Sequence, residues 1–182
     1  YGVSTEHTAY LNLKRGVPAP RSGSAAQNGR TVAEQIGGQI FVDTWGLLAP
    51  GDPARAARYA RTAASVSHDG EALHGAAFIA ACVAAAFSHR DIDSAMDAAL
   101  REIPPESRYS AVVNDVRAFH RAHPESWRDC RSMLENTWGY DRFPGACHIL
   151  PNAGVCAMAL AYSEGDFARG VEIAAAAAWD TD

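Results

Sequence analysis

The stretch that decides the fold is EALHGAAFIAACVAAAF, residues 71–87. Glycine and alanine cover it on every side, so a helix built from it can pack closely against neighbours on all its faces. We therefore expect it at the centre of a helical bundle. Its apolar part ends at Ser88-His89-Arg90 and is too short to span a membrane.

Capping and turn signals predict further helices on both sides of this segment. Ser4 can cap a first helix that ends near Gly16, and Asp52 with Pro53 can open another after a turn. Thr31 and Glu34 form a capping box, which predicts one long helix from about 31 to 49. Its apolar face would hold Ile36, Ile40, Phe41, Trp45 and Leu48.

The second half of the chain is predicted to be helical as well. Proline, glycine and polar breaks place helices at about 91–102, 106–122, 125–137 and 152–162, and a last one begins after Gly165. No segment shows convincing strand alternation. The sequence thus predicts an all-α globule of about eight or nine helices, forming one domain over residues 1–182.

Composition limits the classes of function. The 182 residues are 48% hydrophobic and 20% charged, which is ordinary for a soluble domain. A formal net charge of -5 without clusters of Lys and Arg argues against a nucleic-acid partner. The four cysteines are widely spaced and there is no secretory pattern, so we expect reduced thiols, no membrane partner and a cytoplasmic protein.

The last four residues, Trp179-Asp180-Thr181-Asp182, follow an alanine-rich helix. Two carboxylates just beyond a helix C-terminus, where the helix dipole attracts cations, could hold a hard divalent metal ion. A solvated helix end is the alternative, because Asp-x-Asp alone is a weak signal.

A second stretch of polar residues lies between Gly23 and Gly29. Here Ser24 and Asn28 precede a predicted helix, and the glycines let backbone N–H groups approach an anion such as phosphate. An ordinary flexible loop would have the same composition.

Two more polar groups mark helix boundaries. In Ser65-Val66-Ser67-His68-Asp69-Gly70-Glu71, the His68 imidazole can bond a sugar hydroxyl or a phosphate, whereas Asp69 and Glu71 suit helix capping. In Cys147-His148-Ile149-Leu150-Pro151-Asn152, His148 and Asn152 enter an otherwise apolar helix, although Pro151 and Asn152 also suit a plain helix start.

These segments, in this order, resemble the ADP-ribosylglycohydrolase family, which includes the nitrogenase-reactivating glycohydrolases, the ADP-ribosylhydrolases and the J1 crystallins. Gly165-Asp166-Phe167 before the final helix adds to the resemblance. It implies an all-α fold around a binuclear Mg²⁺ or Mn²⁺ site that cleaves the glycosidic bond between ADP-ribose and a protein side chain or a small acceptor.

Carried over by position, the resemblance assigns roles to particular residues. Asp180 and Asp182 match metal ligands, Asn28 and Gly29 with Ser24 match the loop that faces ribose and phosphate, and His68 matches a histidine of the substrate cleft. No residue is assigned as the general base; Asp69 is the nearest candidate by position.

The sequence also departs from the family pattern. A glutamate-bearing segment and a Thr-Asp-Asp motif, which supply the other metal ligands, do not occur in these 182 residues. The hydroxyl ligand after the second aspartate would fall at position 183. Since the chain begins with Tyr1, we expect it to be the central and C-terminal part of a longer glycohydrolase domain.

Two other functions remain open. A module that binds ADP-ribose without cleaving it would keep the Asn28 and His68 surfaces and could lose the metal-binding acids. A structural protein of the crystallin type would need only the helical core. Retention of Asp180, Asp182 and the polar segments favours a metal-dependent hydrolase, whose acceptor (arginine, serine, a nucleotide or a smaller molecule) the sequence does not identify.

Overall fold

The computed structural model describes residues 4–180, which are helical and contain no strand; Gln35 and His148 form an isolated β-bridge. The all-α prediction is confirmed, with more helices than the eight or nine expected. The elements are α1 (Thr5–Lys14), η1 (Arg21–Gly23), α2 (Ala25–Asn28), α3 (Arg30–Ala33), α4 (Gly37–Ile40), α5 (Asp43–Leu47), α6 (Pro53–Ala64), α7 (Glu71–Ala85), α8 (Ile92–Leu100), α9 (Arg108–Ala122), α10 (Trp127–Trp138), η2 (Tyr140–Arg142), α11 (Ile149–Ser163) and α12 (Phe167–Ala176).

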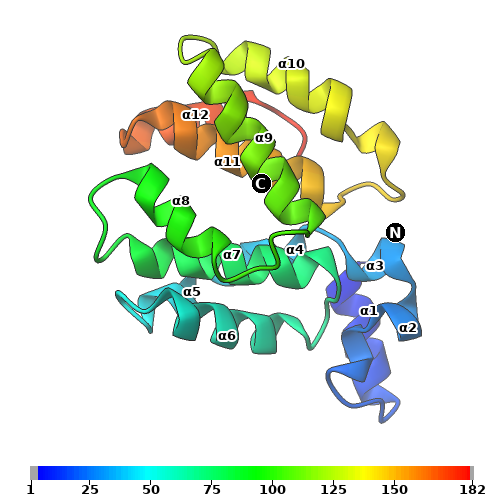
Figure 1. The fold of residues 1–182 in the computed structure, drawn as a ribbon. Coiled ribbons are helices and arrows are strands. Elements are labelled where there is room, and N and C mark those ends of the chain that lie inside the picture. Colours follow the sequence, from blue (N-terminus) through cyan, green and yellow to red (C-terminus); the bar gives the residue numbers. More distant parts are fainter. Residues whose placement is uncertain (1–3, 181–182) are drawn as a thin grey trace.

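Helix α7 occupies the centre, as its composition predicts. Figure 1 shows it between α6 on one side and the group of α9, α11 and α12 on the other. Its small side chains allow this approach: a Cβ on Gly75 would lie 2.5 Å from the Ile149 side chain and 2.8 Å from the Tyr109 ring. Helix α11 is buried along almost all of its length and forms the second axis of the core.

Several helix starts lie where the capping signals place them. The Ser4 hydroxyl accepts a hydrogen bond from the His7 N–H at 3.1 Å and opens α1. The Asp52 carboxylate accepts one from the Arg55 N–H at 3.0 Å and opens α6. These contacts satisfy N–H groups that a helix start otherwise leaves unpaired.

The long helix predicted from 31 to 49 is wrong, because this segment folds as α3, α4 and α5 with turns between them. Its backbone pairs elsewhere: the Ile36 N–H donates to the Cys147 carbonyl at 2.9 Å, and the Ile149 N–H donates to the Glu34 carbonyl at 3.1 Å. A Cβ on Gly38 would lie 2.7 Å from the Ala72 carbonyl oxygen, so this turn packs directly on α7. Close packing onto α7 and α11 therefore outweighs helix continuity.

The expected apolar face of that helix is divided accordingly. Trp45 packs against the α6–α7 core, whereas the side chains of Ile40, Phe41 and Leu48 are exposed. The Glu34 carboxylate, expected to close a capping box with Thr31, instead bonds Arg30 and the Glu71 N–H.

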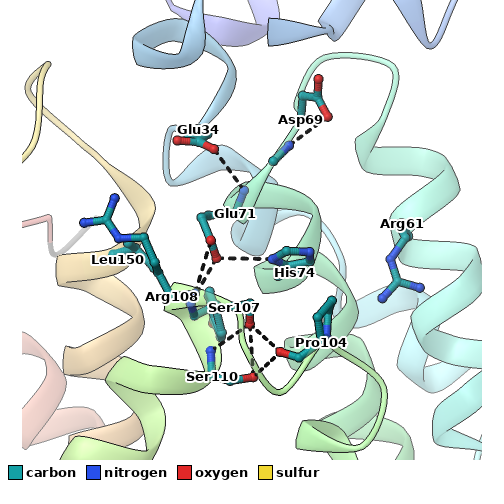
Figure 2. Close-up of polar contacts among 12 residues, drawn as sticks. Glu34, Arg61, Asp69, Glu71, His74, Pro104, Ser107, Arg108, Ser110 and Leu150 are labelled. Carbon is teal, nitrogen blue, oxygen red and sulfur yellow. Dashed lines mark hydrogen bonds and ion pairs between the residues drawn. The ribbon is translucent and has the colours of Figure 1, made fainter.

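Buried carboxylates join the start of α7 to its neighbours (Figure 2). Glu71 accepts hydrogen bonds from the N–H groups of Arg108 (3.2 Å) and Tyr109 (3.0 Å), and thus caps α9. Burial opposes its ionisation, but the hydrogen bonds from His74 and these backbone groups outweigh that effect and hold the pKa of Glu71 below its ordinary value. Glu71 is a structural cap, in agreement with the role that its position in the first turn suggests.

Candidate functional site

The glycine-containing loop and the His68 segment, more than 40 residues apart in sequence, lie against each other. Gly23 makes the approach possible, since a Cβ there would lie 2.6 Å from the Ser67 Cα. The Asp69 carboxylate accepts hydrogen bonds from the Ala25 N–H (2.9 Å) and from the N–H of Gly70 (2.8 Å). Asp69 therefore holds the loop in place, and this use of its carboxylate favours the structural alternative over a general base.

The structure brings Ser24 and His68 together. Both line a hollow of about 440 Å³, whose wall also contains Arg58, Arg61 and Asp69. The hydroxyl of Ser24 caps α2 by accepting a hydrogen bond from the Gln27 N–H at 3.2 Å. We refer to this hollow as the His68 pocket.

Asn28 and Gly29 follow Ser24 closely in sequence, but neither residue lines the His68 pocket. The Asn28 amide donates to the Ser22 carbonyl (2.8 Å) and accepts from the Asn12 amide (2.8 Å), so it stabilises the loop. Gly29 is exposed, has φ of +82°, and would have open space around a Cβ. The helix that follows, α3, has only four residues, so its dipole contributes little to anion binding.

His68 is buried, with 2% of its surface exposed. Its Nδ1 lies 2.8 Å from the Ser67 hydroxyl, and its Nε2 lies 3.5 Å from a carboxylate oxygen of Glu6. Burial lowers the pKa of His68, and the nearby Glu6 carboxylate opposes this effect only in part. Within residues 4–180, Nε2 is buried without a hydrogen-bond partner and lies next to Gly37 of α4.

Asp180 lines a second hollow of about 410 Å³, which we call the Asp180 pocket. Helix α4 contributes Gln39 and Ile40 to its wall, α11 contributes Asn152, and α12 contributes apolar side chains. The Asn152 amide nitrogen donates to the Tyr140 hydroxyl, but its Oδ1 has no partner within the described residues and is fully buried. Asp182, the second predicted metal ligand, lies outside the described residues.

Helix α4 lies against His68 and also lines the Asp180 pocket. A Cβ on Gly37 of α4 would lie 2.8 Å from Nε2 of His68, while Gln39 of the same helix lines the Asp180 pocket. Burial raises the pKa of the Cys147 thiol, and the carboxylates of Asp180 and Glu6 raise it further. Cys147 is thus influenced both by Asp180 and by Glu6, the neighbour of His68, which agrees with His68 and Asp180 lying in one region of the molecule.

The polar side chains of the Asp180 pocket carry oxygen atoms, the type of ligand atom that suits a hard cation. Mg²⁺ and Mn²⁺ prefer oxygen ligands, and the pocket wall contains the carboxylate residue Asp180 and the amide residues Gln39 and Asn152. Among residues 4–180, no three or more His, Cys, Asp and Glu side chains are grouped so as to hold a metal ion. The acidic ligands that these residues provide are therefore few.

Sequence reasoning missed two residues of this region. Glu6 lies in the first turn of α1, and nothing in the sequence indicates that this helix brings it to His68. Gln39 was hidden within the predicted long helix, although it is buried and accepts a hydrogen bond from the Tyr109 hydroxyl at 3.0 Å. The Gly37-Gly38 pair was the available signal, since two adjacent glycines inside a predicted helix indicate close backbone packing.

Comparisons with known proteins identify the family of the chain. The described residues include no helix that is both long and apolar enough to cross a membrane. Searches of curated proteins and of solved structures gave no match. The model of the ADP-ribosylglycohydrolase family matches residues 1–182. The chain therefore belongs to the ADP-ribosylglycohydrolase family, which implies glycohydrolase activity on ADP-ribosylated substrates.

Proposed function

We propose that this chain takes part in the divalent-metal-dependent hydrolysis of the glycosidic bond between ADP-ribose and a protein side chain or a related small acceptor. The observation that carries the proposal is that helix α4 contacts His68 and also lines the Asp180 pocket. The residues assigned to substrate and to metal, His68 and Asp180, are 112 positions apart in sequence, yet one short helix borders both.

In this proposal His68 contacts the ribose. Its buried imidazole is held on the Nδ1 side by Ser67, while Nε2 has no hydrogen-bond partner among the described residues and lies 3.5 Å from the Glu6 carboxylate. Because burial favours the neutral ring, Nε2 can exchange a hydrogen bond with a sugar hydroxyl near neutral pH. Ser24, on the same pocket wall, and the exposed backbone at Gly29 are the further proposed substrate contacts.

Asn28 supports the same loop indirectly. Its amide is engaged by Asn12 and Ser22, so we assign it a positioning role that sets the conformation of the loop before Gly29.

Asp180, together with Asp182, is proposed to hold Mg²⁺ or Mn²⁺. A divalent cation bound there would polarise the ribose hydroxyls and lower the pKa of a water molecule near the anomeric carbon. Apolar side chains beside Asp180, among them Ile36 and Val155, would strengthen electrostatic interactions in the pocket by lowering the local polarity.

Two measurements test this function. ADP-ribose is titrated into the chain by calorimetry, with and without Mg²⁺, and release of ADP-ribose is followed from peptides ADP-ribosylated on arginine or on serine. We expect binding that is stronger with Mg²⁺, cleavage that EDTA abolishes, and loss of both in Asp180→Asn.

His68→Ala should weaken ADP-ribose binding by at least about tenfold, because one good hydrogen bond in a buried pocket contributes about 1.4 kcal/mol. His123→Ala is the matched control: His123 is exposed and lines neither pocket. Binding that is indifferent to Mg²⁺, without cleavage, would identify an ADP-ribose-binding module instead. Equal binding by the His68 and His123 variants would remove His68 from the site.

A further inference from the structure

A small hollow near the start of α11 collects arginines from three separate parts of the chain. Its volume is about 190 Å³, and Arg30, Arg108 and Arg142 all line it. The other polar side chains of its wall are Glu34 and His148. None of these residues lines either of the two pockets described above. We refer to this separate hollow as the arginine pocket.

Two of the guanidinium groups are positioned by contacts that use only some of their donors. One terminal nitrogen of Arg30 lies 3.0 and 3.2 Å from the two carboxylate oxygens of Glu34. One terminal nitrogen of Arg142 donates to the Asn136 carbonyl. A guanidinium has five N–H donors, so both arginines keep donors for a ligand.

The third guanidinium, that of Arg108, is positioned by an aromatic ring. It lies 4.8 Å from the centre of the Phe143 ring, and the other ring contact of Phe143 is the His148 imidazole, stacked at 4.5 Å. Phe143 and His148 are buried, at 7% and 3% exposed, so this support is rigid. Within residues 4–180 no hydrogen-bond acceptor contacts the Arg108 guanidinium, which leaves all of its donors for a ligand.

The charges of the arginine pocket do not balance. Glu34 pairs with Arg30, but among residues 4–180 no carboxylate pairs with Arg108 or Arg142. Nδ1 of His148 accepts a hydrogen bond from the Leu150 N–H at 3.2 Å, so the imidazole is neutral. Three guanidinium groups and one carboxylate leave an excess of two positive charges in the wall. Since like charges repel, packing alone does not explain why they gather here.

Charge and size together define the ligand. A phosphate monoester carries a charge of about -1.5 to -2 at pH 7, which matches this excess, whereas a carboxylate carries a single negative charge. The planar fork of arginine also bonds two phosphate oxygens at once. Pockets for whole small molecules usually exceed about 300 Å³. A hollow of about 190 Å³ therefore suits one phosphate group rather than a complete nucleotide.

We propose that the arginine pocket binds the phosphate group of a phosphate monoester, with Arg108 and Arg142 as its main ligands and Arg30 beside them. Glu34 holds Arg30 in place and opposes the anion, but the excess of positive charge outweighs its effect. The arginines are exposed, so the phosphate can be free or can belong to a phosphorylated side chain whose remainder stays outside. This site lies outside both pockets of the proposed hydrolase function.

The test titrates two probes into the 182-residue chain by calorimetry in a phosphate-free buffer of constant ionic strength, which keeps general charge screening equal. The probes are inorganic phosphate and phosphoserine blocked at both ends; acetate and blocked serine are the controls. We expect a phosphate probe to bind and acetate and blocked serine not to bind. Tighter binding of blocked phosphoserine would identify a phosphorylated side chain as the source, and binding of inorganic phosphate alone would identify free phosphate.

Four variants test the assignment. Arg108→Gln and Arg142→Gln should each weaken phosphate binding by at least about tenfold, because each removes charge-assisted hydrogen bonds. Arg108→Lys should weaken it less, since the charge stays and the fork is lost. Arg121→Gln is the matched control: Arg121 is exposed near the other end of α9 and lines none of the three pockets. Without phosphate, all four variants should unfold at the temperature of the unsubstituted chain, because their side chains are exposed.

Three results would overturn the proposal. They are absence of binding by both phosphate probes, equal binding of acetate, and equal weakening by the Arg121 and Arg108 variants, which would reveal only general surface charge. ADP-ribose binding separates this site from the proposed function. Arg108→Gln should leave that binding unchanged; a loss equal to the loss of phosphate binding would make the arginines part of the substrate cleft and end the proposal of a separate site, while the hydrolase function would stand.

Discussion

Replacing Glu34 by glutamine tests the electrostatic link between the first helices and the core. The Glu34 side chain is 4% exposed and lies 3.0 and 3.2 Å from the Arg30 guanidinium, 3.3 Å from the Glu71 N–H and 3.6 Å from His148 Nε2. Burial raises its pKa, but the contacts with His148, Arg30 and the Glu71 N–H outweigh burial and lower that pKa from 4.5 to about 2.

The size of the effect follows from this pKa. A difference between 4.5 and about 2 corresponds to about 3 kcal/mol in favour of the folded, ionised state at neutral pH. The Arg30 side chain is 67% exposed, so solvent screening weakens the contribution of the Arg30–Glu34 ion pair to this free energy. We therefore expect Glu34→Gln to lower the free energy of unfolding by about 2 kcal/mol at pH 7, and the melting temperature by about 4–8 °C.

The pH dependence identifies the cause. The folded chain keeps Glu34 ionised below pH 4.5, where the unfolded chain takes up a proton. The stabilisation is therefore fully present above pH 4.5 and declines as pH falls toward 2. Urea unfolding is measured at pH 7, 5, 4 and 3. The free energies of unfolding of Glu34→Gln and of the unsubstituted chain should differ by the same amount at pH 7 and 5, and by less at pH 4 and 3.

Glu135→Gln is the control for this experiment. Glu135 also pairs with an arginine, Arg131 at 2.7 Å, but its side chain is 54% exposed, so its loss should change stability by less than about 0.5 kcal/mol. Equal stability of Glu34→Gln and the unsubstituted chain at pH 7 would refute the reasoning, as would a difference that stays unchanged down to pH 3.

Three further outcomes are expected. Gly75→Ala should destabilise the chain by about 1–3 kcal/mol in urea unfolding, because its Cβ would overlap the Ile149 and Tyr109 side chains. Gly170→Ala is the control: the nearest contact of its Cβ would be 3.3 Å, so this variant should be neutral or stabilising. Equal losses of stability in the two variants would contradict the packing argument. Burial lowers the pKa of His68 below 6.5, so the unfolded chain binds the proton first as pH falls. Between pH 6.5 and 5, the free energy of unfolding of the unsubstituted chain should therefore fall relative to that of His68→Gln, by at most about 1.4 kcal/mol per pH unit. Free energies of unfolding that change in parallel with pH in the two proteins would contradict this prediction. Iodoacetamide at pH 8 should modify the half-buried Cys147 before Cys130, whose pKa burial raises to about 12, and mass spectrometry showing Cys130 modified first would overturn this order.

The parts of the fold that depend on local signals could be predicted from the sequence. Ser4 and Asp52 cap helices where the pattern places them, and the alanine-rich segment 71–87 forms the central helix, ending at Ala85. Side chains next to each other in sequence decide these features, so a single sequence contains the necessary information.

The segment from 31 to 49 could not be predicted in the same way. Its fate depends on the Cys147 carbonyl and the Ile149 N–H, which pair with the backbone at Ile36 and Glu34 across more than 100 residues. The apolar spacing that suggested a helix is present, but Ile40 and Phe41 face solvent. A periodic pattern reports which residues are apolar, not which neighbour covers them.

In the candidate site, too, some residues could be predicted from local sequence and others depend on the tertiary structure. The sequence singled out Ser24 and His68, and the structure places both on one pocket wall. It also singled out Asn28, whose amide proves to be bonded within its own loop. Glu6 and Gln39 were missed, since only the tertiary structure brings Glu6 to His68 and Gln39 to the Asp180 pocket.

The pairing of residues 34–36 with residues 147–149 also bears on the order in which the molecule assembles. Helix α4 contacts His68 and lines the Asp180 pocket, and the residues just before it, Glu34 and Ile36, are anchored by a segment that a ribosome makes more than 100 residues later. Contacts of such large sequence separation form late in folding, after α6 and α7 can already have paired locally. We therefore expect the binding surface to be the last part of the chain to form during synthesis, and a nascent chain ending before residue 147 to have a helical core but no competent pockets.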